Sequence, residues 1–190
     1  LPMDTRVRAA ASRASPPADA LDFLLSEHAR HREMCRLLER LADAPMFDAK
    51  EVSNLAEFIR VDLSMHIFDE EEDFFPLLRS YCMPEDEIGV ALDRLDREHA
   101  EDLDLCAQVR VALLTAVSEG KPPSAIPGAP EAFRAFAHSQ RRHMTLENAV
   151  LIPLARLRLP PEAVEALGVR LAARRWRETD SSVVREDLAR

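Results

Sequence analysis

A histidine followed four positions later by a glutamate occurs twice in this chain, at an interval of 77 residues. The pairs are His66 with Glu70 and His143 with Glu147. Side chains four residues apart on an α-helix lie on one face, about one turn from each other, so both can reach a single ion. Each pair is followed at the same distance by a Pro-Leu dipeptide. The repetition predicts two equivalent helices that each carry two ligand side chains.

A second set of residues repeats at an interval of 71, upstream of each His-Glu pair. The two segments share two leucines, a Glu-His-Ala triplet and a cysteine: Leu21, Leu24, Glu27-His28-Ala29 and Cys35 correspond to Leu92, Leu95, Glu98-His99-Ala100 and Cys106. The chain therefore contains two copies of one unit, a helix with a single histidine followed by a helix with His-x-x-x-Glu. Four histidines and two glutamates that meet in a bundle core would form a dinuclear metal site.

Composition restricts the class of protein. Only 4 residues are glycine and 5% are aromatic, whereas 47% are apolar, which favours helices with one core over strands. The net charge of −9 argues against nucleic-acid binding, and no apolar run approaches the roughly 18 residues that span a membrane. Three cysteines without a C-x-x-C spacing fit neither a disulfide framework nor a zinc knuckle. We therefore expect a cytoplasmic protein.

The apolar periodicity predicts an all-α, up-down four-helix bundle with a short fifth helix at the C-terminal side. We expect a flexible N-terminal arm over 1–18, a metal-binding bundle over 19–176 and a C-terminal tail over 177–190. The expected helices cover about 19–42, 50–79, 87–118, 131–157 and 161–176. Pro76 and Pro153 fall at equivalent places in two of them. Because interior proline bends or ends a helix, either outcome is compatible with the sequence.

A metal ion is the simplest way to stabilise Glu70 and Glu147, which lie on otherwise apolar helix faces. Two buried carboxylates that face each other are costly unless a cation compensates them. The alternative is a polar layer without metal, in which the four histidines donate hydrogen bonds to the two glutamates. An imidazole-rich ligand set suits Fe, Zn or Cu, whereas Mg and Ca prefer oxygen ligands.

The order of these six residues resembles that of the hemerythrin-like, or HHE cation-binding, family. The segments LDFLLSEHARHREMC, EEEDFFPLL and ENAVLIPLA add to the likeness. The resemblance covers about residues 19–176 and implies a non-haem centre of two irons, with zinc as a possible substitute. The implied metal ligands are His28 and His66 on one iron, His99 and His143 on the other, and Glu70 and Glu147 as bridges.

Leu103 is one departure from the family pattern. Oxygen-carrying hemerythrins have a further histidine one turn after the position of His99, and here that position is leucine. The resemblance then implies a free position on one iron and reaction with a small ligand such as O₂, peroxide or NO. We keep open a non-catalytic iron or oxygen sensor, or an iron store, that acts through a protein partner. A mononuclear or zinc structural site is a third possibility. No catalytic residue is identified.

Other polar residues have weaker claims. His31 lies one turn from His28 and could add a fifth imidazole, and Asp102 could add an oxygen ligand, although a surface position is simpler for that carboxylate. We expect His138 and the acidic run of Asp69, Glu71 and Glu72 to face solvent. Asp62 and Asp73 are possible hydrogen-bond acceptors for ligand imidazoles. Arg174 and Arg175 could either cap the bundle or meet a partner.

Overall fold

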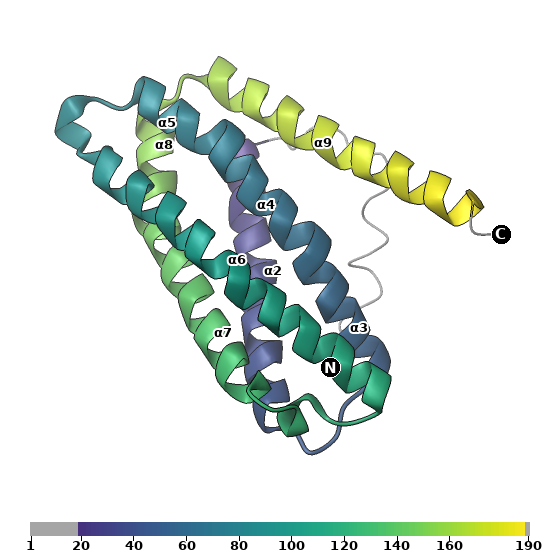
Figure 1. Cartoon of the computed structure of the whole chain (residues 1–190). Coiled ribbons are helices and arrows are strands. Elements are labelled where there is room, and N and C mark those ends of the chain that lie inside the picture. Colours follow the sequence, from purple (N-terminus) through teal and green to yellow (C-terminus); the bar gives the residue numbers. More distant parts are fainter. Residues whose placement is uncertain (1–18, 189–190) are drawn as a thin grey trace.

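The computed structural model describes residues 19–188, with side chains described as far as Arg175. Four helical rods run up and down beside one another, and a fifth helix crosses them (Figure 1). No strand occurs between residues 19 and 188. The expected all-α bundle with a fifth helix is thus confirmed, whereas the expected N-terminal arm lies outside the described residues.

The first rod is α2 (Ala20–Asp43) and the third is α6 (Ile88–Glu119). The second rod is assembled from α3 (Ala49–Phe58), η1 (Ile59–Leu63), α4 (Ser64–Asp69), η2 (Glu70–Phe74) and α5 (Phe75–Tyr81). The fourth contains α7 (Ala129–Leu146), η5 (Glu147–Leu151) and α8 (Ile152–Arg158). Short 3₁₀ turns, η3 (Pro84–Asp86) and η4 (Pro123–Ala125), lie in two of the connections, and α9 (Pro161–Leu188) follows.

Local sequence signals set several helix ends. The Asp19 carboxylate accepts hydrogen bonds from the Leu21 and Asp22 N–H groups and so caps α2. Asp48 caps α3 in the same way. Such caps satisfy N–H groups that have no partner within the helix. At its other end α6 stops at Gly120, whose φ of 64° suits a residue without a Cβ.

The two glutamates of the repeated pairs each begin a π-helical turn. The Phe75 N–H bonds to the Glu70 carbonyl five residues earlier, and the Ile152 N–H bonds to the Glu147 carbonyl in the same way. The next residue in each case is the repeated proline. Proline has no N–H to donate and crowds the carbonyl four residues before it, so a wider turn gives its ring room. The helices therefore continue past both prolines instead of ending there.

The core consists of two apolar clusters separated along the bundle by a polar layer. One cluster includes Leu38, Leu55 and Phe133, and the other includes Leu24 and Leu92. The histidines of α2 and α6 lie between the two clusters in the sequence of each helix. The fold therefore holds the polar side chains of the layer away from both ends of the bundle.

Helix α9 packs against α2 and η2. Its Leu167 and Leu171 are buried and join the cluster that contains Leu24. The helix continues to Leu188, beyond the end that we expected near residue 176. Within the described part of the chain, no helix has the length and apolar character needed to cross a membrane.

Candidate metal centre

Four of the six predicted ligands form one close group in the polar layer. His28 comes from α2, His66 from α4, Glu70 from η2 and Glu147 from η5. One ligand atom of each lies within 4.8 Å of those of the other three, and all four side chains are buried. This group has the donor types and the spacing of a cation site.

The Glu70 carboxylate extends the group toward the other two predicted ligands. Its Oε1 lies 3.1 Å from His66 Nε2 and 3.5 Å from His28 Nε2, while its Oε2 lies 3.7 Å from His99 Nε2. The rings of His99 and His143 are 4.7 Å apart, centroid to centroid. All six predicted residues therefore belong to one buried layer, although His99 and His143 lie outside the closest group of four.

Three of the histidines are oriented by a hydrogen bond at their Nδ1 atom. Their Nδ1 atoms bond to side-chain oxygens: His28 to Asn148 Oδ1 at 2.6 Å, His66 to Glu27 Oε2 at 3.1 Å and His99 to Glu71 Oε1 at 2.9 Å. An Nδ1–H that donates in this way leaves the Nε2 lone pair free to bind a metal. In each case Nε2 faces a carboxylate of the layer.

Several buried polar atoms of the layer have no hydrogen-bond partner among the described residues. Buried polar atoms are nearly always paired, so a set of unpaired polar atoms in one place needs an explanation. The atoms are the Nε2 of His28, His31 and His143, the Oε1 of Glu70 and Glu147, and the Oε2 of Glu98. Bound cations would give these lone pairs partners, and the residues present therefore fit a metal centre.

The pKa values of Glu70 and Glu147 are shifted in opposite directions. Burial alone would raise the pKa of Glu70, but His66 and His28 hold it well below its usual value. Burial and the adjacent Glu70 charge raise the pKa of Glu147 to about 8. Burial would lower the pKa of His66, but Glu70 and Glu27 raise it to about 10. The layer thus attracts positive charge, which either protons or metal ions can supply.

Arginines of α9 bind the carboxylates that surround this layer. Arg175 donates to Glu27 Oε1 at 2.6 Å, and Glu27 in turn contacts His66. Arg174 forms an ion pair with Asp69, and Arg175 lies 2.8 Å from the other oxygen of the same carboxylate. Asp69 has an exposed fraction of 0%, so our expectation that it faces solvent was wrong. The two arginines bind the bundle of their own chain.

Two further acidic residues lie beside ligand candidates. Glu71 is exposed, as expected, and its carboxylate also reaches His99. Asp102, for which we favoured a surface position, is buried and accepts hydrogen bonds from Ser139 and Gln140. Both lie beside ligand candidates of the neighbouring helices, a relation that helical spacing within one segment does not reveal.

The remaining candidates are placed as follows. His31 is buried beside His66, with ring centroids 4.5 Å apart, and its Nε2 has no partner, so its role as a ligand stays a prediction. His138 is exposed, as expected. Neither aspartate considered as a support contacts an imidazole through a described bond: Asp62 pairs with Arg30, and Asp73 pairs with Arg170 and Arg174.

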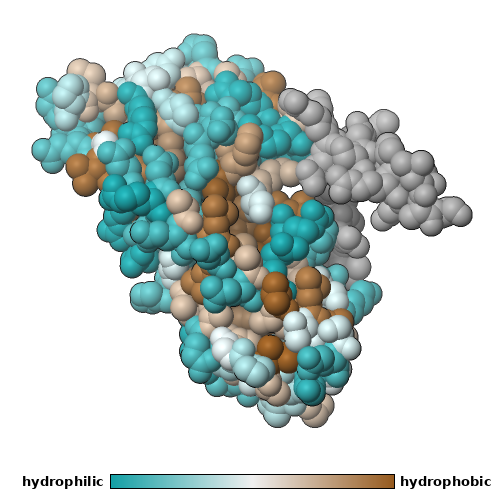
Figure 2. All heavy atoms as spheres, in the orientation of Figure 1, coloured by the Kyte–Doolittle hydropathy of each residue, from teal (hydrophilic) through white to brown (hydrophobic). Residues whose placement is uncertain are grey.

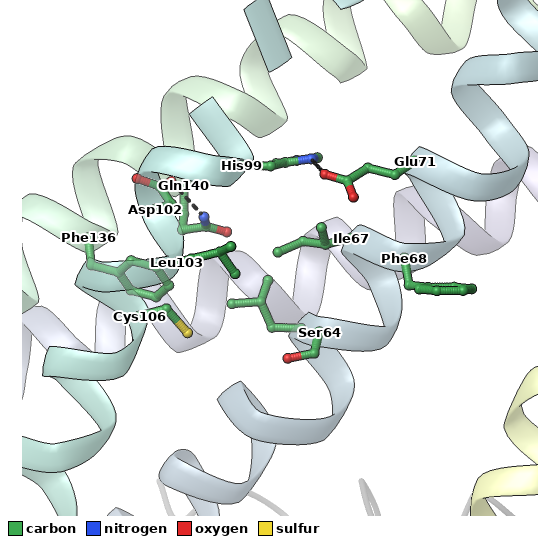
Figure 3. A pocket seen from close by; sticks show the side chains of 11 residues that line it. Ser64, Ile67, Phe68, Glu71, His99, Asp102, Leu103, Cys106, Phe136 and Gln140 are labelled. Carbon is green, nitrogen blue, oxygen red and sulfur yellow. Dashed lines mark hydrogen bonds and ion pairs between the residues drawn. The ribbon is translucent and has the colours of Figure 1, made fainter. Parts of the chain in front are cut away.

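A pocket of about 220 Å³ leads from the surface to this layer between α4 and α6. Its apolar walls include Ile67 and Leu103, which point toward each other, and His99 lies beside them with its bond to Glu71 (Figure 3). Hydrophobic residues gather on this face within a mostly hydrophilic surface (Figure 2). Leu103 is 64% exposed, so it forms the mouth of the pocket.

Two buried glutamates beside the ligands were not predicted to have a role. They are Glu27 and Glu98, the first residues of the repeated Glu-His-Ala triplets. Glu27 contacts His66, and Glu98 Oε2 lies 3.2 Å from His143 Nε2, so each touches the histidine of the following His-Glu pair. Their occurrence in both copies of the repeat was the available signal.

Comparison with known proteins agrees with this geometry. A family model, the hemerythrin HHE cation-binding domain, matches residues 19–155. No curated protein matches the chain significantly. The match spans all four rods of the bundle as far as α8 and includes every residue of the predicted ligand set. The chain therefore belongs to the hemerythrin HHE cation-binding domain family.

Proposed function

We propose that this protein holds a non-haem centre of two iron ions and reacts with a small ligand such as O₂, peroxide or NO. The proposed ligands are His28, His66, Glu70, His99, His143 and Glu147. One observation carries the proposal: the two oxygens of Glu70 face different histidines, Oε1 toward His28 and His66 and Oε2 toward His99. A carboxylate in this position can bridge two cations.

The donor set favours a transition metal such as iron over Mg or Ca. Four imidazoles and two carboxylates are too rich in nitrogen for Mg or Ca, whereas Fe, Zn and Cu accept this mixture. Membership of a cation-binding family supports a metal at this place. Two bound irons would supply redox chemistry of up to two electrons, and zinc could substitute without that chemistry.

The pocket between α4 and α6 supports a small and weakly polar ligand. Its wall includes His99, so a molecule in the pocket can approach the second iron position without crossing the apolar clusters. Ile67, Phe68 and Leu103 make the walls largely apolar. They admit diatomic molecules and peroxide, while the surrounding rods limit access for larger substrates.

Metal analysis of protein produced in iron-replete medium tests the centre itself. The expected result is close to two irons per chain, with a loss of iron in His99→Ala and none in His138→Ala. His138 is the matched control because it is an exposed histidine on α7, the helix that carries His143, and is not part of the buried layer. A stable, folded native protein with one iron or fewer would refute the dinuclear centre.

Access through the pocket is tested by blocking its mouth. Leu103→Trp should slow the binding of azide to the iron-loaded protein, measured by stopped-flow absorption, without changing the iron content. Val111→Trp is the control, because Val111 lies on the same helix with the same 64% exposure but does not line the pocket. Equal rates in both variants would exclude this route.

A sensor or store is the second candidate, favoured by the contacts of α9. Because Arg175 and His66 share the Glu27 carboxylate, a change at His66 can alter how α9 docks. The two candidates differ in turnover: the reactive protein consumes peroxide over many cycles, whereas a sensor or store changes state once per metal centre. Reversible release of O₂ under vacuum from the reduced, O₂-treated protein would instead indicate a carrier.

A further inference from the structure

We propose that Glu98 is an additional ligand of the second metal ion, the one placed near His99 and His143. This inference rests on the proposed dinuclear centre and extends its ligand set. Family resemblance did not point to Glu98, whose position adjoins His99 in the sequence. Three features of the structure support this role: the direction of the His143 ring, the free oxygen of Glu98 and the position of Leu103.

The ring of His143 faces Glu98 as the other histidines face their carboxylates. In His28, His66 and His99, Nδ1 is held from behind and Nε2 faces Glu70 or Glu147. The carboxylate in front of His143 Nε2 is Glu98, whose Oε2 lies at 3.2 Å. Asp102 lies behind the ring, with Oδ2 3.8 Å from Nδ1. By this common pattern, Glu98 occupies the ligand side of His143.

The two oxygens of Glu98 have different environments. Oε1 accepts hydrogen bonds from Arg94 at 2.8 Å and from Arg142 at 2.9 Å. Oε2 is buried and has no hydrogen-bond partner, and the same holds for His143 Nε2. The whole residue is only 8% exposed. The arginines thus fix the carboxylate through one oxygen and leave the other free to bind a cation together with His143.

The position of Leu103 explains why a further ligand is needed. It cannot bind a metal, and its largely exposed side chain forms the mouth of the pocket. Glu98 lies on the same helix but precedes His99, whereas Leu103 follows it, and Glu98 supplies the oxygen ligand that leucine cannot. The second ion would therefore have a more carboxylate-rich ligand set than the first, where the equivalent Glu27 stands behind His66 at Nδ1.

Titration of the metal-free full-length protein with Co²⁺ tests the assignment, because visible absorption of Co²⁺ changes with the number and type of its ligands. The native protein should bind two ions. Glu98→Gln should weaken only the second binding step, by more than about 100-fold, and change its absorption bands. Asp102→Asn, which alters a carboxylate of the same 8% exposure behind the same imidazole, should cost only about 10- to 100-fold and leave the bands in place.

The possible outcomes separate the two proposals. Native protein that binds fewer than two ions refutes both the dinuclear centre and the role of Glu98. Two ions in the native protein, with an unchanged second step and unchanged bands in Glu98→Gln, refute the role of Glu98 alone. If Glu98→Gln does not fold, Glu98→Asp keeps the charge but shortens its reach, and native-like second-step binding in that variant likewise refutes the assignment.

Discussion

Replacing Arg174 by methionine should destabilise the bundle strongly, because the change leaves a buried charge without one of its partners. Asp69 is fully buried, and Arg174 is its ion-pair partner with a side chain only 24% exposed. Arg174 also donates to Asp73 at 2.6 Å and lies over the ring of Phe68 at 4.6 Å. Methionine keeps part of the apolar contact and removes the charge.

The expected magnitude follows from what remains. Removing one partner of a buried ion pair costs about 3–5 kcal/mol. Here Arg175 stays 2.8 Å from the second oxygen of Asp69, so we expect the lower part of that range, about 3 kcal/mol. In a chain of this size, that loss corresponds to a melting temperature lower by roughly 6–12 °C.

Chemical denaturation monitored by circular dichroism provides the assay. The control is Arg134→Met, because the pair of Arg134 with Asp43 is exposed on both sides, at 48% and 75%. Exposed pairs contribute no more than about 1 kcal/mol. Asp69→Asn in the Arg174→Met background should recover part of the stability, since the unpaired charge is then gone. An effect of Arg174→Met no larger than that of the control would refute the reasoning.

Three further predictions concern pH, packing and thiol chemistry. In chelator-treated protein, His66 and Glu147 bind protons in the folded state that the unfolded chain releases, because their pKa values are raised to about 10 and about 8. Their contribution to stability is present below the unfolded pKa values of about 6.5 and 4.5 and is lost as pH rises through the folded values. Thermal unfolding should thus occur at a lower temperature at pH 9 than at pH 6.5, and iron should reduce that difference; equal shifts with and without iron would contradict this. Phe133→Ala should lower the free energy of unfolding by about 3–5 kcal/mol in urea denaturation, because its ring is fully buried, and a loss below about 1 kcal/mol would show that the core can close around the cavity. Cys35 is buried with a pKa raised to about 11, so mass spectrometry should find it alkylated by iodoacetamide at pH 8 more slowly than the partly exposed Cys82, and the reverse order would contradict the structure.

The sequence alone determined the bundle and the order of the six predicted ligands. Helical periodicity repeats within each segment, so apolar faces and the pairs His66 with Glu70 and His143 with Glu147 can be recognised without coordinates. The duplicated prolines indicated that the two helices share a bend or an end at this place. Only the structure showed that π-helical turns let the helices continue past them.

Tertiary structure decided which side chains meet across helices. Glu27 reaches His66 from 39 residues away, and the buried Asp69 pairs with Arg174, which lies 105 residues later in the chain. A surface carboxylate and a buried one have the same local sequence signal, since the difference arises from the helix that covers them. The spacing within one helix fixes a face, whereas the partner of that face depends on how the five helices pack.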